Sequence, residues 1–66
     1  MFNIGDILIR KNGRYYNPTF KIIEKRYSLT ETLYTIQNIR LGYYIIEDIS
    51  EDVLNNDFKL FKKKYG

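Results

Sequence analysis

Neither cysteine nor histidine occurs in this chain of 66 residues, and their absence limits how so short a chain can be stabilised. A domain of this size buries only about 60% of the surface of its unfolded chain, and small folds often add disulfide bonds or structural metals. Disulfides and zinc sites built from Cys or His cannot form here. The fold must therefore depend on one apolar core, for which 44% hydrophobic and 17% aromatic residues provide the material.

The missing imidazole and thiol groups also exclude most catalytic arrangements. The Ser and Thr hydroxyls have no histidine to activate them, so we expect no enzyme activity and no cofactor. No apolar run approaches the ~20 residues that span a bilayer. Residues 1–6 lack the charged and apolar regions of a secretory leader. We therefore expect a soluble, cytoplasmic protein that does not bind membranes.

The residue composition is biased in a way that points to a source. Ile, Asn, Lys and Tyr are abundant and Ala is absent. The abundant residues have A/T-rich codons and Ala has G/C-rich ones. This bias favours a low-GC Gram-positive bacterium or one of its phages, although chance in a short strand-rich chain is an alternative.

Apolar, β-branched and aromatic residues alternate with polar ones over most of the chain, which is typical of β-strands. Within residues 19–27, regular alternation places Phe20 and Ile22 on one face of a strand. Ile23 and Tyr27 then point to the other face. The predicted strands are residues 6–11, 19–27, 33–39, 43–47 and 58–61, with a loop over residues 13–18.

One short segment has a helical pattern instead. Asp48 or Ser50 can cap a helix N-terminus, and Glu51 and Asp52 would then lie in the first turn, where the helix dipole favours negative charge. Residues 55–57 are polar and are expected to end the segment. We therefore predict a single helical turn before the last strand, which closes the sheet.

This order of elements resembles the SH3-like small β-barrel, including KOW-type domains. The resemblance depends on Gly-Asp-Ile-Leu-Ile at residues 5–9, and on residues 49–54 followed by residues 58–61. It implies an all-β, five-stranded antiparallel barrel over residues 1–61 with a basic tail over residues 62–66, similar to small proteins of phages or low-GC Gram-positive bacteria. The chain has no Trp and its first long loop is basic, so polyproline binding is not predicted.

Charge is divided along the chain although the net charge is only +3. Residues 10–27 carry six cationic side chains and one acidic one, whereas residues 28–58 carry one cationic and six acidic ones. This division suits a partner of mixed or complementary charge. The first hypothesis is therefore a non-catalytic accessory or inhibitory protein that binds a host protein.

Cations interleaved with tyrosines are the most distinctive feature of the first half of the chain. The cluster comprises Arg10, Lys11, Arg14, Tyr15, Tyr16, Lys21, Lys25, Arg26 and Tyr27. Such a set can bind a protein, or it can bind single-stranded nucleic acid by neutralising phosphates and stacking on bases. It can also be no more than the solvated face of a strand. Nucleic-acid binding through residues 10–27 is therefore the alternative function.

Two further groups complete the candidate surfaces. Tyr43 and Tyr44 are predicted to join the partner-binding surface because Tyr with Arg is typical of protein-interface hot spots, and Arg40 and Tyr34 lie nearby in sequence. A secondary acidic surface comprises Glu47, Asp48, Glu51 and Asp52. Its spacing matches no calcium loop, so no metal is expected. Homodimerisation through an edge strand or an aromatic patch stays open.

Overall fold

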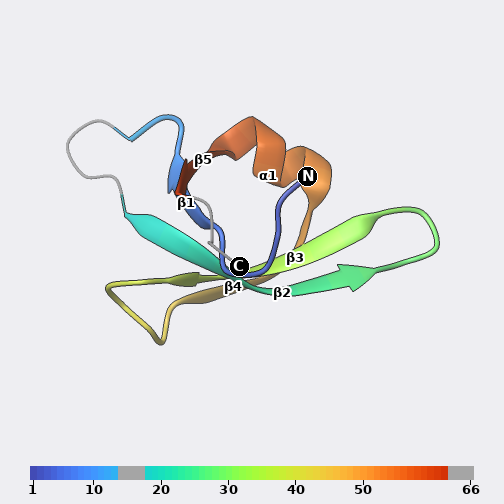
Figure 1. Cartoon of the computed structure of the whole chain (residues 1–66), viewed down its shortest axis with the longest axis horizontal. Helices are drawn as coiled ribbons and strands as arrows, with labels where there is room; N and C mark the ends of the chain where they lie inside the picture. Colours follow the sequence, from blue (N-terminus) through green and yellow to red (C-terminus); the bar gives the residue numbers. More distant parts are fainter. Residues whose placement is uncertain (14–17, 63–66) are drawn as a thin grey trace.

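The computed structural model describes residues 1–13 and 18–62 and consists mainly of one antiparallel sheet (Figure 1). The elements are β1 (Ile7–Arg10), β2 (Thr19–Tyr27), β3 (Thr32–Asn38), β4 (Ile45–Ser50), α1 (Glu51–Asp57) and β5 (Phe58–Lys62). The strand order is β4-β3-β2-β1-β5. The predicted five-stranded antiparallel fold, with one short helix before the last strand, is confirmed.

The sheet is open, whereas the sequence predicted a closed barrel. β4 and β5 lie at its two edges, and no pairing among the described residues joins them. The short helix α1 connects these strands directly and packs against both, and its Leu54 side chain is fully buried. α1 lies over one side of the sheet (Figure 1), and its Leu54 belongs to the buried core, so the helix rather than pairing of the edge strands covers the apolar side chains at this place.

The turn between β3 and β4 is longer than the sequence predicted. Tyr43 and Tyr44 belong to this turn, so β4 begins at Ile45 rather than at Tyr43. Asn38 holds the turn: its backbone N–H donates to the Tyr44 carbonyl at 2.9 Å, and its side-chain oxygen accepts from the Leu41 N–H at 2.8 Å. This closure removes both tyrosines from the strand.

The helix extends beyond the single turn that was predicted. Ser50 is the N-cap, and its side chain accepts from the Val53 N–H at 3.3 Å, as the sequence indicated. The polar residues 55–57, expected to end the helix, form its last turn. The Phe58 N–H then donates to the Leu54 carbonyl, and β5 begins. Lys62, expected in a basic tail, is the last residue of β5, and residues 63–66 lie outside the described residues.

A β-bulge reverses the predicted facing of the second half of β2. Ile22 pairs with Ile36, but Glu24 pairs with Thr35, so Ile23 is an extra residue in the ladder. From this point Lys25 lies opposite Tyr34, on the core face. Regular alternation across Ile23 was therefore a wrong prediction, and Tyr27 lies on the same face of the sheet as Ile22.

One small core holds the molecule together. Its buried hydrophobic residues are Phe2, Leu8, Phe20, Ile22, Tyr34, Ile36, Leu54 and Phe58, with Ile46 and Ile49 packed against them. The rings of Phe20 and Phe58 meet edge to face with their centroids 5.5 Å apart, and those of Phe2 and Tyr34 at 6.1 Å. The β2–β3 hairpin extends beyond this core (Figure 1), in a molecule of 38 × 24 × 23 Å.

Candidate functional site

The cations predicted to form one binding surface occupy separate places in the fold. Arg14, Tyr15 and Tyr16 lie outside the described residues. The Arg10 guanidinium lies 5.9 Å from the ring centroid of Phe20 and 5.2 Å from that of Phe58. The Lys11 ammonium donates to the Asn55 carbonyl of α1 at 2.6 Å. Arg10 therefore covers one end of the core, and Lys11 ties the end of β1 to the helix.

The neighbours Lys25 and Arg26 point to opposite faces of the sheet. The Lys25 ammonium donates to the Phe2 carbonyl at 2.8 Å and lies 5.7 Å from the ring centroid of Tyr34. Arg26 forms an ion pair with Asp48 of β4, and its Nε lies 3.8 Å from a carboxylate oxygen of Glu24. Strand alternation separates the two neighbours, and the bulge at Ile23 decides that Lys25, not Arg26, shares the core face with Tyr34. The described cations consequently form no single basic groove.

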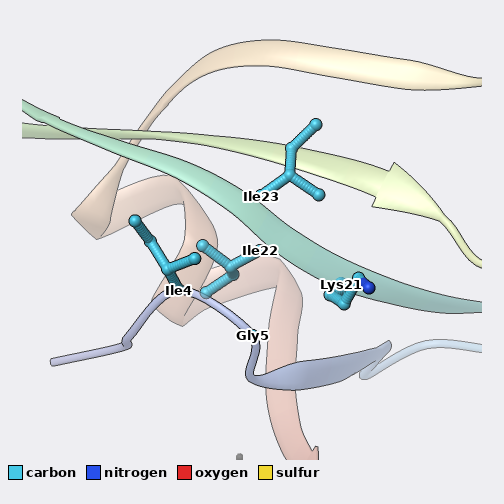
Figure 2. Close-up of a pocket in the computed structure, with 5 residues that line it drawn as sticks. All are labelled: Ile4, Gly5, Lys21, Ile22 and Ile23. Atoms are coloured by element: carbon cyan, nitrogen blue, oxygen red, sulfur yellow. The ribbon is translucent and has the colours of Figure 1, made fainter.

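Lys21 differs from these cations because its side chain lies beside a shallow hollow. Its backbone pairs with β1 and β3, but its side chain makes no hydrogen bond, ion pair or ring contact with the residues that the structure describes. The hollow has a volume of about 410 Å³ and is lined by Ile4, Gly5, Lys21, Ile22 and Ile23 (Figure 2). The sequence marked Lys21 as a binding residue but did not indicate the hollow.

Backbone pairing between the N-terminal segment and β2 forms this hollow. The Gly5 N–H donates to the Ile22 carbonyl at 2.8 Å, and the Ile22 N–H donates to the Asp6 carbonyl at 3.0 Å. Gly5 has a φ of 96°, a value that favours glycine. The hollow therefore depends on a glycine turn on one side and on the bulge at Ile23 on the other.

The turn after β3 presents a group of exposed apolar side chains, here called the aromatic turn. Its members are Leu41, Tyr43, Tyr44 and Ile45, and the side chain of Tyr43 is 84% exposed. Sequence reasoning identified the two tyrosines but not Leu41 and Ile45. The sequence signal for these two residues was position, because Leu41 directly precedes Gly42 and Ile45 directly follows Tyr44.

Hydrogen bonds make the aromatic turn rigid. In addition to the two contacts of Asn38, the Tyr44 N–H donates to the Leu41 carbonyl at 2.8 Å. The Gln37 side-chain amide donates to the Gly42 carbonyl at 2.7 Å. The Tyr44 ring meets Phe20 edge to face at 6.0 Å, so Tyr44 is anchored on the core while Tyr43 projects into solvent.

The predicted acidic surface is divided between structural contacts and solvent. Asp48, in a left-handed backbone conformation with a φ of 56°, pairs with Arg26. Glu51 accepts a hydrogen bond from the Tyr34 hydroxyl at 2.5 Å. Asp52 lies in the first turn of α1, and Glu47 is exposed. Among residues 1–13 and 18–62, no group of three or more acidic side chains is placed to hold a metal ion.

Among the titratable groups of residues 1–13 and 18–62, the Tyr34 hydroxyl is the one with a clearly shifted pKa. Burial of the ring, together with the hydrogen bond to Glu51 and the charge of that carboxylate, raises the pKa of Tyr34 to about 12. The hydroxyl also lies 3.4 Å from the Phe2 N–H, which donates to it. Tyr34 therefore stays protonated at neutral pH and serves as a structural hydrogen-bond centre.

Comparison with known proteins found no matching family model, no matching curated protein and no matching solved structure. The one described helix, α1, is too short to cross a membrane. Function is therefore inferred from the chain's own side chains.

Proposed function

We propose that the protein is a non-catalytic module that acts by binding another protein through the aromatic turn. The observation that carries this proposal is the combination of a highly exposed Tyr43 with a turn held rigid by hydrogen bonds. The turn leads directly into β4, an edge strand of the open sheet. Aromatic and aliphatic side chains therefore lie next to backbone groups that can pair with a partner.

Physical considerations favour this turn as an interface. Tyr43, Tyr44 and Ile45 are consecutive and are 84%, 43% and 44% exposed. Tyrosine is common among residues that dominate binding energy, because it buries much apolar area and loses few rotamers. A turn that is already ordered also loses less conformational entropy on binding. These properties support a protein-binding role.

The distribution of the cations favours a protein over a nucleic acid as partner. Nucleic-acid grooves need several cations and aromatic faces along one continuous path. Here Lys25 and Arg26 lie on opposite faces, and Arg26 is paired with an acidic side chain. Nucleic-acid binding through residues 10–27 is retained as the alternative that the experiment below must exclude.

Strand order and composition extend the proposal. The position of β5 beside β1, with α1 directly before it, supports a relationship to SH3-like barrels, including the KOW type. The low-GC residue composition supports a phage or low-GC bacterial source. In that setting, the protein acts as an accessory or inhibitory factor in the cytoplasm, and its partner is a host protein.

Affinity capture from a lysate of a low-GC Gram-positive bacterium, with and without nuclease, tests the proposal. The tagged full chain is compared with Tyr43→Ser, and the retained proteins are identified by mass spectrometry. We expect a small set of proteins that survives nuclease treatment and is lost with the Tyr43 variant.

Tyr27→Ser is the matched control, because Tyr27 is an exposed tyrosine on β2, away from the aromatic turn. It should retain the same proteins as the unmodified chain. Equal capture by the Tyr43 variant would contradict the aromatic turn as the interface. Loss of all bound proteins on nuclease treatment would favour the nucleic-acid alternative.

A further inference from the structure

Among the described cations of the predicted binding surface, Lys21 is the one whose side chain makes no hydrogen bond, ion pair or ring contact with the described residues. Arg10 lies over two aromatic rings, Lys11 and Lys25 donate to backbone carbonyls, and Arg26 is ion-paired. Those four side chains therefore have structural roles. The Lys21 ammonium remains available to an anion from outside.

The surface beside Lys21 is apolar and concave. Ile22 forms the fully buried floor of the hollow, and Ile4, which is 50% exposed, lies next to it (Figure 2). Ile23 lies further along β2, on the other side of Ile22 from Lys21, so the hollow has a cation at one end and a branched aliphatic side chain at the other. An occupant must therefore combine an apolar group with a negative charge.

We infer that this hollow binds the C-terminal residue of a partner polypeptide, with its apolar side chain against Ile4 and Ile23 and its carboxylate on the Lys21 ammonium. A C-terminal residue carries both groups on one Cα atom, which suits a small hollow lined by a cation, Lys21, and by two apolar side chains, Ile4 and Ile23. This inference rests on the proposal that the partner is a protein, and it specifies the part of the partner that enters the hollow.

The dimensions of the hollow fit so small an occupant. A volume of about 410 Å³ lies near the lower end of the 300–1,000 Å³ typical of ligand pockets. The walls are also largely pre-formed, because the backbone hydrogen bonds between Gly5, Asp6 and Ile22 hold the N-terminal segment against β2.

Nuclear magnetic resonance titration of the full, ¹⁵N-labelled chain tests the inference. The probes are two peptides, acetyl-Gly-Ser-Gly-Ser-Leu with a free C-terminal carboxylate and the same peptide with a terminal amide. We expect saturable shifts of the Ile4, Gly5 and Ile23 amide signals with the acid. The amide peptide should bind about fivefold more weakly, because its neutral terminal amide cannot form an ion pair with the exposed Lys21 ammonium.

Two substitutions complete the test. Lys21→Gln should abolish the preference for the acid, whereas Lys59→Gln, which removes an exposed strand lysine that does not line the hollow, should preserve it. Equal affinity for both peptides, or no saturable shift at the hollow, would overturn the inference. Either result would leave the aromatic turn untouched, since that proposal depends on the Tyr43 variant in affinity capture.

Discussion

At the scale of single residues, Tyr34 lies where four parts of the chain meet. Its buried ring packs edge to face against Phe2, and its hydroxyl accepts from the Phe2 N–H and donates to Glu51 at the start of α1. Lys25 completes the arrangement by donating to the Phe2 carbonyl. The N-terminal segment, β2, β3 and α1 are therefore joined around one phenol group.

Replacement of Tyr34 by Phe should destabilise the protein without changing its fold. The substitution keeps the ring in the core but leaves the Glu51 carboxylate and the Phe2 N–H without this partner. We expect a loss of about 1–2 kcal/mol in the free energy of unfolding, measured by urea denaturation followed by circular dichroism. An unchanged midpoint and slope would show that the hydroxyl contributes no net stability.

Tyr34 also gives the protein a defined response to alkaline pH. Its pKa is about 12 in the folded chain, compared with about 10 for an unfolded tyrosine. Between these values the unfolded chain releases the proton while the folded chain keeps it, so the free energy of unfolding falls as the pH rises. The stability difference between the unmodified chain and Tyr34→Phe should therefore be constant below pH 10 and shrink from about pH 10 to 12. A difference that does not change with pH would contradict this assignment.

Lys21 and Lys25 should respond differently to truncation although they lie four residues apart. Lys25→Ala removes the hydrogen bond to the Phe2 carbonyl and should cost about 1 kcal/mol. Lys21→Ala removes an exposed side chain with no contact among the described residues and should change stability by less than about 0.5 kcal/mol. Thermal unfolding of both variants measures the difference. Equal losses of stability would contradict the placement of Lys25 on the core face of β2.

At the scale of elements, three β-bulges shape the sheet. They place an extra residue in β2, in β4 and in β5, and the β4 bulge contains Asp48 with its positive φ. Bulges increase the local twist and disturb the exposed edge of a strand. The bulge in β5 therefore limits uncontrolled pairing at that edge, and the bulge in β4, which lies after Ile46, leaves the start of β4 beside the aromatic turn regular.

The cap of α1 is the element most easily tested. Ser50→Ala removes the oxygen that accepts from the Val53 N–H and should cost about 1 kcal/mol, whereas Ser50→Asp keeps an acceptor and should preserve stability. Hydrogen exchange of the α1 amides should become faster in the Ala variant. Exchange rates that match those of the unmodified chain would show that packing of Leu54 alone maintains the helix.

At the scale of the whole molecule, one core provides the stability. A domain below about 70–80 residues rarely gains more than about 3–5 kcal/mol from its core. Here the buried side chains come from the N-terminal segment, α1 and every strand except β4, whose Ile46 and Ile49 pack against them at the edge. Truncation of a fully buried core side chain should therefore unfold the whole domain rather than one part of it.

Ile36→Ala tests this dependence on a single core. Ile36 is fully buried on β3, and its truncation should cost about 2–5 kcal/mol, which is comparable to the whole stability of such a domain. We expect a largely unfolded variant, seen as loss of amide signal dispersion. Val53→Ala, at an exposed position of α1, is the control and should stay folded. If Ile36→Ala stays folded and unfolds cooperatively, the free energy of unfolding of the unmodified domain is larger than its size indicates.

Local patterns were sufficient to predict most of the elements. β-branched and aromatic residues identified Thr19–Tyr27 as a strand with the observed bounds, because strand preference depends on neighbouring side chains. Asp48 and Ser50, with two acidic residues after them, indicated the region in which α1 starts, since capping needs only a side-chain oxygen and nearby N–H groups, and the structure selects Ser50. Residue type selected Tyr43 and Lys21 as candidate binding residues. The hollow beside Lys21 had no local signal, because it is formed by hydrogen bonds between the N-terminal segment and β2.

The amino-acid sequence by itself therefore determined the class of the fold, the approximate strands and the single capped helix. Each of these depends on interactions within a few residues. Long-range pairing specified the rest. The extra residue at Ile23 is recognised only when β2 is aligned with β3, and it decides that Lys25 faces the core and Arg26 faces Asp48. Whether a charged side chain is available to a partner depends on which distant groups already contact it, and those groups are brought near only by folding.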